Sequence, residues 1–385
     1  MRMFCFLDFF GQTQMNILTS APKSCRIYPV ILLSALLIII LLLSLKCSTV
    51  PLWLDIRNLN YFNSVEFQLS QLTPNCTQDK RQLQHYVFQH QLNQLGSWTA
   101  CYSDQYLLQL YEADLNIPND DDRILLFDIG ANKGYVIATW LSLWMPELGI
   151  NPPKLYDFLS TKLKLTDCGA CSDCKEVGFI NASITRRIKK VIEIYAFEPQ
   201  PSTYQALRQV QQWTNLSSFH VFDLGFSNQT GVAMLSACGT GVEWCGLATN
   251  PTSENAKSFV KVNITTLDDF VRLHRIQRRI DVLKIDTEGF DPLVLQGASR
   301  LLQEQRIRLM IFEYHGVGMW STTTLEKVVH NLDRQGYACY QLGRTGILRL
   351  TNCWAPIFER KMWSNVLCIS RSERILIQSI EKLLV

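Results

Sequence analysis

The run from Ile124 to Gly134, I-L-L-F-D-I-G-A-N-K-G, constrains the fold of this 385-residue chain more than any other feature. Its first four residues are apolar without alternation, which is typical of a parallel strand covered on both faces. Asp128 follows the apolar residues, and Gly130 permits a tight turn in which the backbone approaches a ligand. A helix that begins after the turn would direct its first N–H groups toward the same place. The run therefore predicts a strand, a turn and a helix of the kind that holds a nucleoside cofactor.

The residues of the turn distinguish between two classes of cofactor. A dinucleotide needs glycines at G-x-G-x-x-G spacing, but Asn132 takes the place of the second glycine and Tyr135 that of the third. The turn therefore disfavours NAD and a nicotinamide-dependent oxidoreductase. S-adenosylmethionine (SAM) suits it, because the SAM carboxylate can use the helix N-terminus while Asp128 faces the ammonium group.

Apolar runs that suit strands alternate with segments that suit helices along the rest of the chain. We expect helices at 203–213, with a cap near Ser202, and at 325–332, after the cap region 321–324. The expected strands lie at 124–128, 191–197, 219–224, 281–285, 307–313 and 364–370. This order predicts an α/β fold with a doubly wound, mostly parallel sheet. An insert at 146–190 is much longer than an ordinary connection, and we expect it to be functional, for example as a lid.

Carboxylates follow two further strands at the predicted carboxyl edge of the sheet. Glu198 comes directly after 191–197 and can accept hydrogen bonds from both hydroxyls of a ribose, or it is simply a solvated residue at a strand end. Asp286 and Glu288 follow the strand at 281–285 and can face one site, where burial and repulsion raise a carboxyl pKa toward that of a general base. The alternative is that one of these two acids caps the helix near Pro292.

Four blocks of the sequence, spread over about 123–341, resemble the FkbM family of SAM-dependent methyltransferases. They are F-D-I-G-A-N-K-G at 127–134, A-F-E-P at 196–199, T-T-L-D-D-F at 265–270 and K-I-D-T-E-G-F at 284–290. The resemblance implies a Rossmann-like methyltransferase fold, and an activity on hydroxyls of sugars and other natural products. The cofactor-binding residues that it implies are Asp128, Gly130, Ala131, Asn132, Gly134, Glu198 and Asp286.

Four residues are candidates for the catalytic base that removes the proton of the acceptor hydroxyl. Asp286 and Glu288 rank first, ahead of Glu313 and His315, which can also be plain polar residues at a strand edge. The chain departs from the family pattern between Gly225 and Gly231, where it has no acid. The adenine contacts are therefore left open, with Asp223 and Ser227 as the candidates.

Residues 27–45 form an apolar stretch without charge, long enough to cross a bilayer as a helix. We expect a tail at 1–26, a transmembrane anchor at 27–45, a polar stem without a helical period at 46–95, and the methyltransferase domain at 96–385. A cleaved signal peptide is the alternative to the anchor. The net charge of +3 and the absence of a long basic run argue against a nucleic acid partner.

Glycosylation sequons and cysteines point to the compartment of the domain. Ten cysteines lie beyond Cys47, and five sequons begin at Asn75, Asn181, Asn215, Asn228 and Asn263. They favour a single-pass type II protein of the Golgi or endoplasmic reticulum with a luminal domain, although the charges that flank the anchor do not decide its orientation.

The cysteines are expected to form disulfides. Cys168, Cys171 and Cys174 are spaced as in some metal sites, but no second cysteine–histidine cluster lies near them, so structural pairing is favoured over a metal. Cys238 with Cys245, and Cys339 with Cys353, are the expected local pairs.

These features predict a membrane-anchored SAM-dependent O-methyltransferase that acts on hydroxyls of glycans or glycosylated molecules. Two alternatives remain open: an enzyme that faces the cytosol and methylates lipids or small molecules, and a non-catalytic scaffold that retains the fold.

Overall fold

The computed structural model describes residues 76–95, 123–168, 191–243, 245–246, 259–343 and 346–384. The chain divides into two units, Met1–Phe62 and Asn63–Val385, and all of the described residues belong to the second. The predicted anchor at 27–45 lies outside them. Within the described ranges, no helix is both long and apolar enough to cross a membrane.

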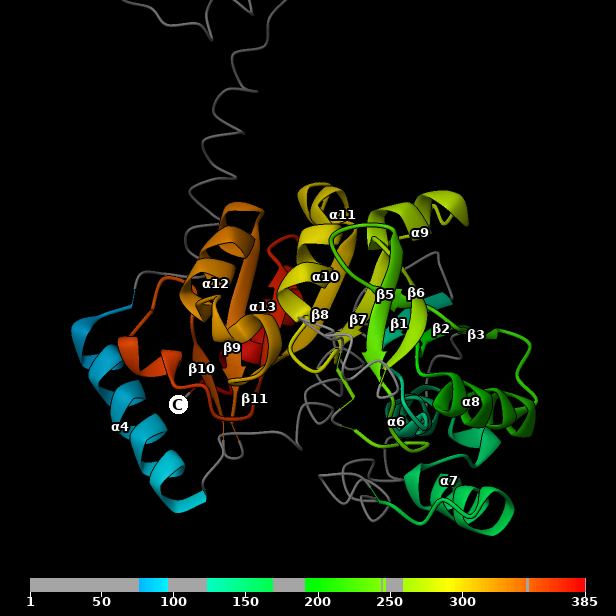
Figure 1. The fold of residues 1–385 in the computed structure, drawn as a ribbon. Helices are drawn as coiled ribbons and strands as arrows, with labels where there is room; N and C mark the ends of the chain where they lie inside the picture. The colour runs from blue at the N-terminus through cyan, green and yellow to red at the C-terminus, as the bar shows by residue number, and fades with distance from the viewer. Residues whose placement is uncertain are drawn as a thin grey trace, which may run out of the picture. The chain divides into compact units, whose positions relative to one another are not determined.

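The centre of the domain is an eight-stranded, mostly parallel sheet, as predicted (Figure 1). Its strand order is β10-β9-β11-β8-β7-β1-β2-β3. The strands β8, β7, β1, β2 and β3 are parallel neighbours, whereas β11 runs antiparallel to both β8 and β9. The bounds are Arg123–Ile129 (β1), Val191–Phe197 (β2), Phe219–Phe222 (β3), Ile280–Ile285 (β7), Ile307–Tyr314 (β8), Tyr337–Leu342 (β9), Ile347–Arg349 (β10) and Ser364–Ser370 (β11).

Helices cover both faces of this sheet. Residues of β1 alternate between two apolar cores, with Ile124 and Leu126 in one and Leu125 and Phe127 in the other. The first core contains residues of α6 (Tyr135–Trp144), α7 (Pro152–Phe158), α8 (Pro201–Thr214) and α13 (Arg374–Glu381). The second contains residues of α4 (Gln78–Leu95), α9 (Leu267–Leu273), α10 (Asp291–Gly297), α11 (Ser299–Gln303) and α12 (Leu325–Arg334). The predicted doubly wound arrangement is therefore confirmed.

The sequence pattern predicts six strands of the large sheet and misses five others in the described ranges. The missed ones are β9 and β10, and a small sheet of order β4-β6-β5 formed by Gly225–Phe226 (β4), Gly231–Ser236 (β5) and Phe259–Thr265 (β6). Both predicted helices are present, but α8 is capped by Gln200 rather than Ser202, whereas Thr324 caps α12 within the expected region. Short helical turns lie at Pro146–Leu148 (η3), Leu159–Leu163 (η4), Gly318–Ser321 (η7) and Pro356–Glu359 (η8).

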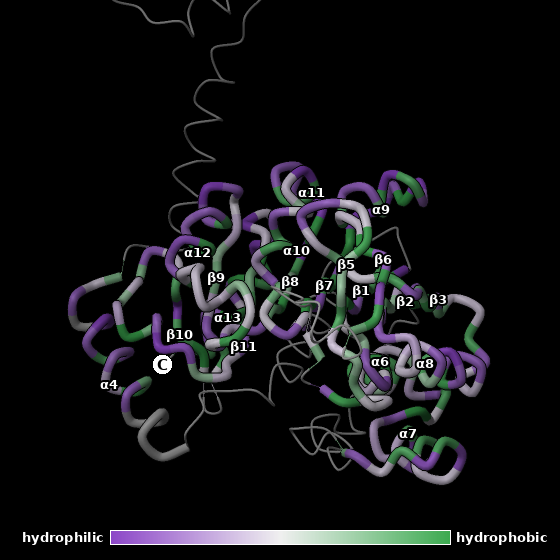
Figure 2. Tube along the Cα trace, in the orientation of Figure 1, coloured by the Kyte–Doolittle hydropathy of each residue, from purple (hydrophilic) through white to green (hydrophobic). Residues whose placement is uncertain are grey.

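Helix α4 forms in a part of the predicted stem where the sequence shows no helical period. Most of its residues are hydrophilic, as Figure 2 shows, so the helix has no apolar stripe to reveal it. Phe88, the one large side chain that is fully buried among the α4 residues whose burial is described, packs edge-on against Phe358 with ring centroids 5.4 Å apart. A Cys76–Cys353 disulfide also fastens the residues before α4 to the domain. The role of 46–95 as a stem stays a prediction.

Of the two predicted disulfides, one is present in the structure and the other is not. Cys238 and Cys245 are bonded, as expected. The pairing of Cys339 with Cys353 is wrong, because strand β11 places Cys368 directly opposite Cys339 on β9 and these two are bonded. Cys353 pairs with Cys76 instead. Cys168 is also disulfide-bonded, whereas Cys171 and Cys174 lie outside the described residues.

Candidate active site

The turn between β1 and α6 brings the ends of β1 and β7 together through Gly130. This residue has a φ of +82°, and a Cβ added to it would lie 1.8 Å from the carbonyl oxygen of Asp286. The Asp286 N–H donates to the carbonyl of Ile129 at 2.9 Å. A side chain at position 130 would therefore force the two strand ends apart, which explains why the turn needs glycine.

Glu198 fixes the same turn from the end of β2. Its Oε2 accepts the backbone N–H of Asn132 at 3.0 Å, and its Oε1 accepts that of Gln200 at 2.8 Å. Burial raises the pKa of Glu198 to about 7, against the effect of these two hydrogen bonds, and Asp128 and Asp286 raise it further. Each carboxylate oxygen has a second lone pair, so the capacity to accept ribose hydroxyls is retained.

Helix α6 begins at the turn without a capping side chain. Its N-cap residue, Gly134, has a φ of +88°, and no acidic residue lies in the first turn of the helix. Asn132 also has a positive φ, 45°, and its Oδ1 is buried without a hydrogen-bond partner among the described residues. The turn therefore presents a helix N-terminus, which favours an anion, beside a buried acceptor oxygen that suits a polar ligand.

Strand β7 contributes a buried ion pair. Lys284 and Asp286 are two residues apart and so lie on one face of the strand, with Lys284 Nζ 2.8 Å from Asp286 Oδ2. Burial alone would lower the pKa of Lys284, but Asp286, Asp128 and Glu313 together raise it above its ordinary value. Lys284 is therefore charged at neutral pH and fixes the orientation of Asp286.

Two acids after β7 lie close to Asp286. Burial raises the pKa of Glu288 to about 8, with further increases from Asp286, Asp291 and Glu243. Burial and Asp286 likewise raise the pKa of Asp291 to about 7. Neither Asp286 nor Glu288 caps α10, which has no capping side chain. The alternative prediction, that one of them serves as a helix cap, is therefore wrong.

Glu313 and His315 complete the cluster at the end of β8. Burial and the charge of Asp286 raise the pKa of Glu313 well above its ordinary value, whereas burial lowers that of His315 to about 4. The Val317 N–H donates to His315 Nδ1 at 3.1 Å, so the proton of the neutral ring is assigned to Nε2, which lies 3.8 Å from Glu313 Oε2. Trp363 packs against the His315 ring with centroids 4.0 Å apart.

The structure thus brings Asp128, Glu198 and Asp286 to one edge of the sheet, where their charges act on one another. Glu288, Glu313 and His315 lie at the same edge, and the individual roles of all these residues stay predictions. Of the two residues considered for the adenine, Ser227 is buried at the end of β4 and Asp223 is exposed.

Sequence reasoning did not assign Lys284 or Asp291 to the site. A lysine beside the apolar residues 282, 283 and 285 of the strand was the available signal for Lys284, because a buried ammonium group needs a carboxylate partner. Asp291 precedes Pro292, as at an ordinary helix start. In the structure it is fully buried, and its carboxylate accepts the Thr287 hydroxyl at 3.2 Å and the Glu313 N–H at 3.3 Å.

Solved structures that resemble this chain include two distant ones. The precorrin-6y C5,15-methyltransferase of Geobacter metallireducens aligns over 69% of this chain and 87% of its own, with 13% identity and a TM-score of 0.28. A human methyltransferase 10 domain containing protein aligns over 76% and 96%, with 10% identity and a TM-score of 0.31. TM-scores this low support no conclusion about function.

A curated protein also matches part of the chain. A probable dipeptidyl-aminopeptidase B of Paracoccidioides lutzii is 27% identical over 135 residues, which are 35% of this chain. The chain spans 14% of the length of that protein. So short an alignment at this identity indicates no shared activity.

A family model gives a more specific result. Residues 167–339 match the methyltransferase FkbM domain. The matched range includes Glu198, Asp286, Glu288, Glu313 and His315, and begins after the turn at 128–134. This match confirms the resemblance to the FkbM family over residues 167–339, which contain the blocks at 196–199, 265–270 and 284–290, whereas the block at 127–134 lies before them.

Proposed function

We propose that this protein is a membrane-anchored, SAM-dependent O-methyltransferase that acts on hydroxyls of glycans or glycosylated molecules in the secretory pathway. One observation carries the catalytic part of the proposal. The carboxylates of Asp128, Glu198 and Asp286 converge on a glycine turn at the N-terminus of a helix. This is where an open parallel sheet binds its ligand, at the carboxyl ends of its strands.

The residues at this edge fit SAM by charge and by hydrogen bonding. The N-terminus of α6 suits the SAM carboxylate, Asp128 the ammonium group and Glu198 the ribose hydroxyls. The neighbouring carboxylates also suit a cation, because the positive charges of SAM would stabilise their ionised forms. When bound, SAM supplies an electrophilic methyl group.

The protein has to align the acceptor hydroxyl and remove its proton. Alignment is the larger effect, worth about 7–11 kcal/mol of the barrier. Asp286 and Glu288 are the preferred bases, because Lys284 fixes the former and the raised pKa of the latter makes it a stronger proton acceptor. His315 Nε2 lies 3.8 Å from Glu313 Oε2, beyond hydrogen-bond distance, so we rank both residues below Asp286 and Glu288 as bases.

Trp363 supports an acceptor that contains a ring. Its side chain is 39% exposed, and it packs on His315, whose Nε2 lies 3.8 Å from Glu313 Oε2. A flat apolar surface next to hydrogen-bonding groups suits the face of a sugar ring whose hydroxyls point sideways.

The luminal location is supported by the described sequons and disulfides. Asn215, Asn228 and Asn263 are all exposed, so an oligosaccharyltransferase could reach them. Three disulfides with both partners described are consistent with an oxidising compartment. A luminal enzyme requires imported SAM, because the cofactor is made in the cytosol. A shift in gel mobility after endoglycosidase treatment would support this topology, and the absence of any shift would favour a cytosolic domain.

Calorimetry with SAM and transfer of labelled methyl groups to a panel of glycans test the catalytic proposal. We expect the purified protein to bind SAM and to label a glycan, and the Asp286→Asn variant to lose labelling. Absence of SAM binding would overturn the proposal in favour of a scaffold. Binding with labelling of lipids or small molecules alone would overturn the assigned acceptor.

A further inference from the structure

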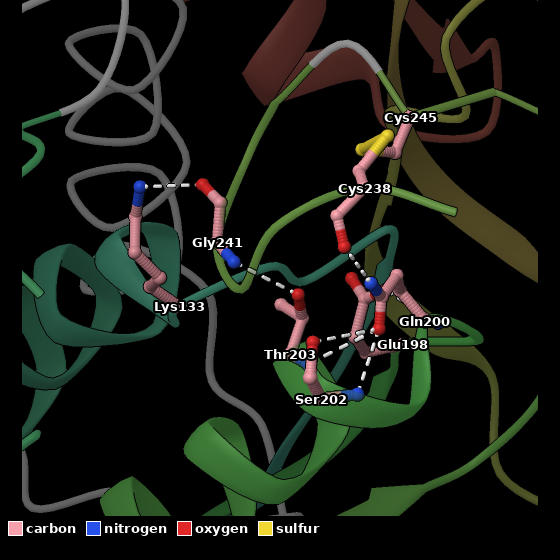
Figure 3. Close-up of a disulfide and its surroundings, with 8 residues drawn as sticks. All are labelled: Lys133, Glu198, Gln200, Ser202, Thr203, Cys238, Gly241 and Cys245. Atoms are coloured by element: carbon pink, nitrogen blue, oxygen red, sulfur yellow. Dashed lines mark hydrogen bonds between the residues drawn. A yellow bond between two sulfur atoms is a disulfide. The ribbon is translucent and has the colours of Figure 1, made fainter. Parts of the chain in front are cut away.

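The Cys238–Cys245 disulfide closes a loop that has no part in the function proposed above. We call its described residues, Cys238, Gly239–Glu243 and Cys245, the disulfide loop. Figure 3 shows Gly241 of this loop between Lys133, which comes from the cofactor turn, and Thr203, which comes from α8. The loop therefore contacts two elements that build the predicted cofactor site.

On one side the loop is bound to the residues that follow Glu198. Gln200 Nε2 donates to the carbonyl of Cys238 at 2.6 Å, and the Gly241 N–H donates to Thr203 Oγ1 at 2.9 Å. The backbone N–H of Gln200 donates to Glu198 itself. The disulfide loop and the proposed ribose carboxylate thus share Gln200 as a common neighbour.

On the other side the loop receives a buried lysine from the cofactor turn. Lys133 is 1% exposed, and its Nζ donates to the carbonyl of Gly241 at 2.8 Å and lies 3.9 Å from Glu243. It also contacts Asp167, in the insert, at 3.3 Å. Gly241 has a φ of +76°, and a Cβ there would lie 2.6 Å from Lys133 Cδ. The loop is therefore shaped to accommodate the lysine stem.

The residue that follows the disulfide loop lies close to the backbone of a candidate base. A Cβ on Gly246, next to Cys245, would lie 3.3 Å from the carbonyl oxygen of Glu288. Glu243 is also close enough to raise the pKa of Glu288. The disulfide loop consequently connects the cofactor turn, the Glu198 segment and the Glu288 segment.

We propose that Lys133 is a positioning residue for the cofactor turn, and that the Cys238–Cys245 disulfide holds Gly241 and Glu243 within reach of its ammonium group. The proposal rests on the function proposed above. Asn132 and Gly134 flank Lys133, and Glu198 already holds Asn132 by its N–H. Anchoring the lysine side chain fixes the turn from the opposite side. Without its partners the buried ammonium group would move toward water and displace the turn.

Two substitutions test this connection: Lys133→Met, and Cys238→Ser combined with Cys245→Ser. We expect both to weaken SAM binding, measured by calorimetry, by about tenfold or more, the effect of losing one hydrogen bond to a charged group. Lys133→Arg should restore most of the affinity, because it keeps the charge and the donors. The controls are Lys327→Met, at an exposed position of α12, and Cys76→Ser with Cys353→Ser, which removes a disulfide elsewhere; both should bind SAM as the parent does.

Hydrogen exchange without cofactor provides a second measurement. The amides of residues 130–135 should exchange faster in Lys133→Met and in the Cys238/Cys245 variant, and at the parent rate in both controls. Parent-like SAM affinity in these two variants would overturn the proposal. If the parent protein binds no SAM, the proposed function fails, and unchanged exchange in the variants would then separately exclude the link between loop and turn.

Discussion

The two ends of strands β7 and β8 differ in how their buried charges are balanced. At the amino ends, Arg308 donates to Glu373 at 2.6 Å and lies 3.6 Å from Asp281, and Arg279 forms a further ion pair with Glu373. At the carboxyl ends, Lys284 interacts with four carboxylates, those of Asp128, Asp286, Glu288 and Glu313, and the charge of Asp286 also acts on Glu198 and Asp291. Two arginines therefore balance two acids at one end, whereas acids outnumber the base at the other.

We infer from this difference that the buried charges at the amino ends stabilise the fold, whereas those at the carboxyl ends serve to bind a ligand. Ion pairs at the amino ends satisfy each charge within the protein. The carboxyl ends keep several acids with raised pKa values, an arrangement that is typical of functional sites. Substitutions of the charged residues at the two ends should therefore differ: those at the carboxyl ends should mainly reduce activity, and those at the amino ends should mainly reduce stability.

The largest effect is expected from Gly130→Ala at the carboxyl end. The added Cβ overlaps the Asp286 carbonyl oxygen, so we expect loss of measurable SAM binding and destabilisation by about 3 kcal/mol or more. Calorimetry and urea unfolding would measure the two effects. Gly231→Ala is the matched control, because a Cβ there meets nothing within 4 Å. Parent-like SAM affinity in Gly130→Ala would contradict the assigned role of the turn.

At the same end, Asp286→Asn should reduce activity much more than it reduces stability. We expect methyl transfer to slow by roughly 100- to 10,000-fold, the contribution of a general base. Stability at pH 8 should fall by less than in Glu373→Gln, because the lost attraction to Lys284 is offset by the removed repulsion from Glu288, Asp291 and Glu313. Single-turnover rates and urea unfolding are the measurements. A variant that is less stable but equally fast would place Asp286 with the structural ion pairs.

Glu373→Gln tests the amino end and should show the reverse pattern. The substitution leaves Arg308 and Arg279 without their shared carboxylate, so we expect destabilisation by about 3 kcal/mol. The rate of methyl transfer per folded molecule should match the parent. A change in that rate at saturating SAM would show that the two ends are not independent.

The pH dependence of stability should differ between the protein with and without SAM. The pKa values of Glu198 and Asp291 are raised to about 7 and that of Glu288 to about 8, so the folded state binds more protons than the unfolded state up to that range. Without SAM, stability should therefore fall as pH rises from 6.5 to 8, by about 1.4 kcal/mol per pH unit for each extra proton. His315, with its pKa lowered to about 4, acts in the opposite sense below pH 6.5.

Urea unfolding between pH 6.5 and 8 measures this slope, and Glu198→Gln should reduce it. SAM binding should release protons in the same range, because its positive charges favour ionised carboxylates. Heats of binding in buffers of different ionisation enthalpy would detect the release. A stability curve that is flat or rises over this range would contradict the raised pKa values.

The smallest effect is expected at Trp363, on the rim of the carboxyl end. Trp363→Ala should raise KM for a glycan acceptor by about 5- to 10-fold, and Trp363→Phe by less, because a smaller flat surface remains. The affinity for SAM should not change. If KM for the acceptor is unaltered in Trp363→Ala, the acceptor does not contact this side chain.

The sequence was sufficient to predict the strands that carry the site, because their apolar runs end in Asp128, Glu198 and Asp286. It was not sufficient to predict which charged side chains lie next to these acids in the folded protein. Asp291 resembles a helix-start residue until the fold buries it beside Glu313. The partner of Cys339 depends on the insertion of β11 between β8 and β9, and no spacing in the sequence specifies that neighbour. Helix α4 was not predicted because it has no apolar stripe. It is held against the domain by Phe88 and by the disulfide of Cys76, which precedes the helix.

The Cys76–Cys353 disulfide has a practical consequence for handling the protein. Its cysteines are 277 positions apart, so the covalent ring that they close includes most of the catalytic region. A single proteolytic cut between them would leave both fragments covalently joined. Such nicked material would migrate as one species on a gel until a reducing agent is added.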